Sequence, residues 1–201
     1  MGYLNKEWRP GFGTIYTWFA MDRYGRIAVM VNNCFGDLPR ILLGLDDVDS
    51  LLDSISEFVW EESPQVSVYP EEKKGSAEVD LFSAWRYRGC STDDVFADLQ
   101  EDLFDRGVFS ELNLPVNKGF YVYHGVEGDN PGVDYPVGYS GESEMGDYFR
   151  FLVPTKFAGI KEFPEFLRKG IVVSNEVDFS TDRLLRSSLI NDYFPAMYEG
   201  E

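Results

Sequence analysis

The residues that most often carry chemistry are scarce in this sequence. His124 is the only histidine, and Cys34 and Cys90 are the only cysteines. A catalytic triad or a two-histidine metal site would need His124, but the strand-like alternation of Phe120–His124 favours a partly buried structural histidine. Zinc-binding cysteines come in closely spaced pairs, so both thiols are expected to be structural, and no metal site or cofactor is predicted.

Motifs of catalysis and nucleotide binding give no clear signal either. Gly11-Phe12-Gly13 matches the start of a dinucleotide fingerprint, but the third glycine is missing and a strand follows where a helix is needed. The acidic stretch 127–134 departs from EF-hand spacing and suits a glycine- and proline-containing turn. Carboxylates are numerous enough for glycosidase-type chemistry, yet no pair stands out. The sequence therefore favours a protein that is not an enzyme.

The carboxylates themselves form the most distinctive pattern. The chain carries 35 acidic and 18 basic residues and a net charge of −17. Seven acidic residues and no basic one lie within Asp46–Glu62, and six more lie within Ser91–Asp105, again without a basic residue. Nucleic acid and anionic membrane surfaces would repel such a chain, so a basic protein partner is expected instead.

Both acidic stretches have the periodicity of amphipathic helices, which we expect over Asp46–Glu62 and Thr92–Arg106. Acidic residues recur four positions apart in each of them: Asp49, Asp53, Glu57 and Glu61 in the first, and Asp94, Asp98 and Asp102 in the second. Like charges at this spacing destabilise a helix by about 0.2–0.5 kcal/mol per pair. A helix selected only for stability would place lysines among them.

Two interpretations of these acidic ridges stay open. They are either the solvated face of an acidic protein or an electrostatic docking surface for a basic partner. The docking interpretation predicts nine partner-binding residues: Asp49, Asp53, Glu57, Trp60, Glu61, Asp94, Asp98, Glu101 and Asp102. In this set Trp60 would be an aromatic anchor, although core packing explains it equally well. The sequence does not decide whether the two helices share a surface.

The remaining elements predict an α+β fold. Thr14–Met21 and Ile27–Val31 read as a β-hairpin around a turn at Asp22–Gly25. Further strands are expected at Val66–Tyr69, Gly119–Val126, Asp147–Val153 and Ile171–Phe179. Glu78–Arg88 suits a helix slightly better than a strand, and Asp182–Tyr193 is expected to be a last helix.

The organisation of the chain is expected to be simple. Residues 1–201 should form a single domain, in which two to four helices pack on a mainly antiparallel sheet. Flexible loops are expected near 70–77 and 127–146. No apolar run suits a signal peptide or a membrane span, so a cytoplasmic protein that does not contact a membrane is predicted.

Two parts of the sequence carry a family resemblance. Tyr16–Ala28 combines an aromatic-rich strand containing Trp-Phe, a nearby aspartate, a glycine and a second apolar strand. Lys118–Tyr123 is followed by a loop and by Tyr148-Phe149-Arg150 with Pro154. In these segments the chain resembles immunity proteins of bacterial polymorphic-toxin and contact-dependent competition systems.

The resemblance implies a protein that neutralises a cognate toxin by binding and occluding it. Many such toxins are basic nucleases, which suits the acidic charge of this chain, and no catalytic residue is carried over. One alternative is a nucleic-acid mimic that inhibits DNA-binding proteins in general, which would need carboxylates spread along an elongated surface. A carboxylate-dependent enzyme is a further alternative, and it would need a deep pocket with one carboxyl of raised pKa.

Overall fold

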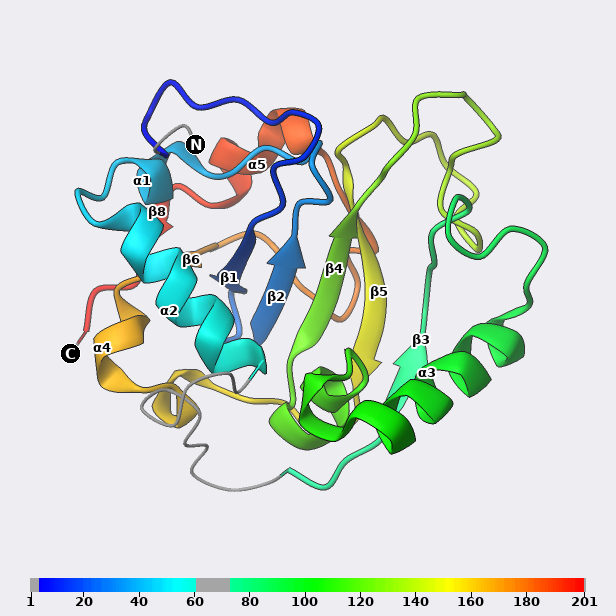
Figure 1. Cartoon of the computed structure of the whole chain (residues 1–201). Coiled ribbons are helices and arrows are strands. Elements are labelled where there is room, and N and C mark those ends of the chain that lie inside the picture. Colours follow the sequence, from blue (N-terminus) through cyan, green and yellow to red (C-terminus); the bar gives the residue numbers. More distant parts are fainter. Residues whose placement is uncertain (1–3, 61–72, 201) are drawn as a thin grey trace.

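A mixed β-sheet runs through the chain in the computed structural model, which describes residues 4–60 and 73–200 (Figure 1). Its eight strands are β1 (Thr17–Met21), β2 (Ile27–Val31), β3 (Ala77–Val79), β4 (Tyr121–Gly125), β5 (Tyr148–Pro154), β6 (Ile171–Val173), β7 (Leu184–Leu185) and β8 (Ala196–Met197). They are ordered β3-β5-β4-β2-β1-β6-β8, and β7 pairs with β5. One sheet and one buried core make the described residues a single domain.

Most neighbouring strands of this sheet are antiparallel. The expected hairpin is present, with Thr17 opposite Val31 and Met21 opposite Ile27. Among the described strands, β1–β6 and β2–β4 pair in parallel, whereas the other pairs are antiparallel. The α+β class and the mainly antiparallel sheet are confirmed.

Two of the helices are longer than a single turn. In the described residues the α-helical segments are α1 (Arg40–Leu43), α2 (Val48–Trp60), α3 (Thr92–Arg106), α4 (Glu165–Arg168) and α5 (Ile190–Tyr193). A 3₁₀ turn, Gly107–Phe109, extends α3, and a short π-helical segment, Leu114–Lys118, precedes β4. The two acidic helices predicted from the sequence are therefore α2 and α3.

Local chemistry fixes the ends of these two helices. At the start of α3, Ser91 and Asp94 form a reciprocal capping box, and Gly107 adopts a positive φ of 57° at its end. The last turn of α2 contains no basic residue of its own. Lys118 supplies the missing cation, because its Nζ donates a hydrogen bond of 2.6 Å to the Val59 carbonyl.

Helices and loops cover both faces of the sheet (Figure 1). Successive residues of β1 point to opposite faces. Phe19 packs against Phe163, which in turn packs against Phe58 of α2. Trp18 packs edge-on against Phe194, directly after α5. Therefore α2 covers one face and the C-terminal segment covers the other.

The helix expected at Glu78–Arg88 is wrong. Ala77–Val79 forms β3 against β5, and Phe82 makes an isolated bridge with Val137. Between them, Asp80 binds two arginines from distant parts of the chain, Arg150 and Arg183. These long-range partners override the weak helical pattern.

The helix expected at Asp182–Tyr193 is wrong over most of its length. Leu184–Leu185 adds to the sheet as β7, and only Ile190–Tyr193 is α-helical. The strand expected at Ile171–Phe179 ends at Val173, because the Ser174 hydroxyl accepts a hydrogen bond from the Val177 amide and starts a turn.

Three further expectations concern the segments 66–69, 70–77 and 127–146. The strand expected at Val66–Tyr69 and part of the loop near 70–77 lie outside the described residues, and β3 begins at Ala77. Residues 127–146 contain no helix or strand, and Val137 joins them to Phe82. No helix in the described part of the chain is long and apolar enough to cross a membrane.

Candidate functional site

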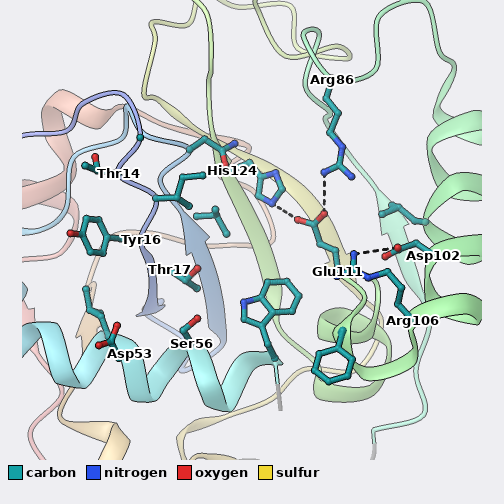
Figure 2. A pocket seen from close by; sticks show the side chains of 18 of the residues that line it. Thr14, Tyr16, Thr17, Asp53, Ser56, Arg86, Asp102, Arg106, Glu111 and His124 are labelled. Atoms are coloured by element: carbon teal, nitrogen blue, oxygen red, sulfur yellow. Dashed lines mark hydrogen bonds and ion pairs between the residues drawn. The ribbon is translucent and has the colours of Figure 1, made fainter. Parts of the chain in front are cut away.

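A cleft of about 1060 Å³ lies between α2 and α3 (Figure 2). Its floor is a row of register partners across three strands. Thr17 of β1 lies opposite Val31 of β2, and Val31 lies beside His124 of β4. All three side chains belong to the face of the sheet that α2 covers, and all three line the cleft. The central strands therefore form a fixed base between the two acidic helices.

Helical spacing builds the two walls. From α2, the lining residues are Leu52, Asp53, Ser56 and Trp60, and from α3 they are Asp98, Leu99, Asp102 and Arg106. Residues three or four positions apart share a helix face, so each helix turns one coherent stripe toward the cleft. Asp53 and Ser56 lie on one side of the cleft in Figure 2, and Asp102 and Arg106 lie on the other. The two acidic helices thus border one cavity, a relation that the sequence did not reveal.

The cleft contains part of the predicted partner-binding set. Asp53, Trp60, Asp98 and Asp102 line it, whereas Asp49, Glu57, Asp94 and Glu101 do not. Glu61 lies outside the described residues. Trp60 is half-buried, and it packs against the core while it lines the cleft.

Two acids of the predicted set have local structural partners instead. The Asp49 carboxylate accepts the amide hydrogen of Leu4 at 3.2 Å. Asp94 closes the capping box of α3, and hydrogen bonds from the backbone and side chain of Ser91 lower the pKa of its carboxyl. Their regular spacing along the ridges therefore does not indicate a shared role.

A charged cluster at the end of the cleft was not predicted from the sequence. Glu111 contacts the Nε2 atom of His124, and it forms an ion pair with Arg86, whose Nη1 lies 3.6 Å from the Oε2 atom of Glu111. Burial opposes the ionisation of Glu111, but His124, Arg86 and Arg106 outweigh it and lower the pKa of this carboxyl. His124 is buried, as expected, and it also takes part in this cluster. Glu111 lies in an irregular segment without periodicity, so the sequence carried no signal for it.

The carboxylates of the cleft differ in how they are neutralised. Asp102 pairs with Arg106 at 3.3 Å, and Glu111 pairs as described above. Asp53 and Asp98 have no ion-pair partner anywhere in residues 4–60 and 73–200. Tyr16 also lines the cleft. Burial and then the charges of Asp49 and Asp53 raise the pKa of its hydroxyl.

Aromatic side chains complete the lining. Trp8 and Tyr16 meet edge-on with their ring centroids 5.6 Å apart, and Phe109 lies beyond the end of α3. Rings beside exposed carboxylates suit the long side chains of lysine and arginine, whose stems are apolar and whose heads are cationic. The arrangement can bind a basic, partly apolar segment.

The described residues contain no group of three His, Cys, Asp or Glu side chains placed to hold a metal ion. In the acidic stretch 127–134, Asp134 instead accepts hydrogen bonds from the amide and the side chain of Asn130. This geometry is that of the expected turn. Cys34 and Cys90 are both free thiols.

Comparisons of the chain with protein-family models, with curated proteins and with solved structures find no match. The geometry of the cleft is therefore the basis for its interpretation.

Proposed function

We propose that this chain is a non-catalytic immunity protein, which neutralises a cognate bacterial toxin by binding a basic segment of it in the α2–α3 cleft. The observation that carries this proposal is the pair of acidic helices on opposite sides of one cavity, where Asp53 and Asp98 have no ion-pair partner among the described residues. The partial sequence resemblance to immunity proteins supports the same function.

The charges and the aromatic residues of the cleft have different tasks in this proposal. The net charge of −17 raises the rate at which a basic surface arrives, and it does so less as salt is added. Affinity comes from a few buried anchors, for which Trp60 and Phe109 are the candidates at the cleft. A toxin held in this way loses access to its own substrate by occlusion.

Two alternatives receive less support from the geometry. A nucleic-acid mimic needs carboxylates spread at phosphate-like intervals, but here several of them gather around a single cavity. A carboxylate-dependent enzyme needs a general acid of raised pKa. Glu111, the most buried carboxyl of the cleft, has a lowered pKa and stays ionised.

Co-purification tests the proposed function. The tagged chain is expressed in the organism that encodes it, and bound proteins are identified at low and then at high salt. A single basic partner in equal amount, which is toxic when it is expressed alone, is expected. Several unrelated DNA-binding proteins would instead support the mimic.

Charge reversal then tests the cleft. Asp53→Lys and Asp98→Lys should each slow the association with that partner, because both acids line the cavity and the part of the chain that the structure describes offers them no counter-ion. Glu101→Lys is the matched control, since Glu101 is exposed on α3 and does not line the cleft. Equal losses for all three variants would contradict the assignment of the cleft.

A further inference from the structure

We propose that Arg86 and Arg106 are built-in competitors for the basic side chains of the partner: they neutralise one end of the cleft in the free protein and give way when the partner binds. This inference rests on the proposed function. It follows from the unequal pairing of the carboxylates, because Asp102 and Glu111 have arginine partners while Asp53 and Asp98 have none in residues 4–60 and 73–200.

The arginine pairs of the cleft have the geometry of weak pairs. Arg106 is 59% exposed and lies 3.3 Å from Asp102, and Arg86 is 54% exposed and lies 3.6 Å from Glu111. Elsewhere the same chain makes a short and buried pair, in which Arg150 is 10% exposed and lies 2.7 Å from Asp80. Solvent-exposed pairs contribute little to stability, so Arg106 can leave Asp102 at small cost. Glu111 is only 15% exposed, but it keeps its contact with His124 when Arg86 leaves.

The displaced arginines have favourable positions to occupy. The guanidinium of Arg86 already lies 5.0 Å from the centre of the Tyr87 ring, where a cation–π contact holds it when Glu111 is taken. Arg106 is at the exposed C-terminal end of α3, where the helix dipole favours a cation. Release from the carboxylates therefore leaves neither arginine buried without a partner.

An order of binding follows from this arrangement. The basic segment first meets the bare carboxylates, Asp53 and Asp98, where nothing has to be displaced. It then replaces Arg106 at Asp102 and Arg86 at Glu111. The arginines thereby reduce binding of weakly basic proteins, which cannot drive the second step.

Titration of the full-length chain with a hexalysine peptide at low salt tests the inference. Arg106→Gln and Arg86→Gln keep most of the side-chain stem and remove the competing charge. Each is expected to tighten hexalysine binding by about two- to five-fold, the range set by exposed ion pairs. Arg88→Gln is the matched control, since Arg88 is exposed, does not line the cleft and has no ion pair within the described residues. This variant should bind like the wild type.

The outcomes separate the inference from the proposed function. Asp53→Asn and Asp98→Asn should weaken hexalysine binding, and urea denaturation should show that every variant is folded. If these two variants weaken binding but Arg106→Gln and Arg86→Gln do not tighten it more than Arg88→Gln, the inference is wrong and the proposed function stands. If hexalysine binding does not depend on Asp53 and Asp98, or is not detected, both are overturned.

Discussion

The two faces of the sheet use the same charged residue types in opposite ways. On the face opposite the cleft, Phe179 packs against Tyr121 and Tyr123 of β4, and the charged groups around it are buried and paired. Arg26 joins Asp22 at 2.8 Å and Asp178 at 2.5 Å. On the cleft face, the two arginine pairs are longer and their arginines are more exposed, and within the described residues Asp53 and Asp98 have no ion pair.

This difference teaches that charge density alone does not reveal a role. Buried carboxylates with several hydrogen bonds hold distant segments together, as when Asp22 also accepts the backbone amide of Phe179. The carboxylates of Asp53 and Asp98 on the walls of the cleft have no ion pair or hydrogen bond within the described residues. They cost helix stability through like-charge repulsion, a cost that the proposed docking role would explain. The predictions below test that contrast.

The largest effect is expected at Asp80. Asp80→Asn removes the carboxylate that Arg150 and Arg183 each approach to 2.7 Å, and it leaves Arg150 buried without a counter-charge. The free energy of unfolding should fall by about 3–5 kcal/mol, as measured by urea denaturation. The control is Asp53→Asn in the cleft, which should change stability by no more than about 0.5 kcal/mol. Similar losses for both variants would remove the distinction between the faces.

The next comparison is between the buried hydroxyls of Tyr148 and Tyr87, which differ in their hydrogen bonds. The Tyr148 hydroxyl donates to the Asp37 carbonyl at 3.0 Å and accepts from the Trp18 indole at 3.2 Å. Tyr148→Phe leaves the buried indole without a partner, so it should destabilise the protein by about 1–3 kcal/mol. Tyr87, beside Arg86, has a buried hydroxyl without a hydrogen-bond partner in the described part of the chain. Tyr87→Phe should therefore be neutral or stabilising, and thermal melts of both variants check this.

The dependence of stability on pH should come in part from Asp178, on the face of the sheet opposite the cleft. Burial opposes the ionisation of Asp178, but hydrogen bonds from Ser180 and the pair with Arg26 lower its pKa to about 2. A lowered pKa means that ionised Asp178 contributes its full stability above its ordinary pKa of 3.8, and this contribution is lost as the pH falls toward 2. Asp178→Asn should lose about 1–2 kcal/mol at pH 7. Its stability should also fall less than that of the wild type between pH 4 and pH 2, and equal slopes would contradict this prediction.

The smallest effect is expected on the cleft wall itself. Asp98→Asn removes like-charge repulsion with Asp94 and Asp102, four residues away on either side. Each relieved pair should raise stability by about 0.2–0.5 kcal/mol, while hexalysine binding weakens. Asp94→Asn, on the same ridge, should instead lower stability, because Asp94 closes the capping box of α3. A loss of stability in Asp98→Asn would show that this acid supports the fold.

Local signals made much of the fold predictable. The hairpin, the stripe of buried residues on α2 and both ends of α3 follow from residue type and spacing, since Ser91 and Gly107 mark the limits of α3 in the sequence itself. The strands β3 and β7 were missed because they exist only through pairing with β5, which is far away in the chain.

The site was predictable only in part for a similar reason. Asp53, Asp98 and Asp102 belong to periodic helices and could be proposed from spacing. Glu111 and Arg86 reach the cleft from irregular segments, and Glu111 meets Arg86 and His124 only after the chain has folded. Which of the acids form ion pairs depends on the positions of Arg86 and Arg106 in the folded chain, and no local sequence pattern encodes these positions.

The segment from Glu111 to Lys118 has a mechanical role that its short length hides. It starts just after the turn that extends α3, and at its other end Lys118 holds the last turn of α2 through the Val59 carbonyl. The segment therefore links the C-terminal end of α3 to the last turn of α2, and it fixes the distance between these two walls of the cleft. Residues Leu112–Lys118 of this segment do not line the cleft. Substitutions that change the charges of the cleft-facing sides of α2 and α3 therefore leave the contacts of these residues unchanged.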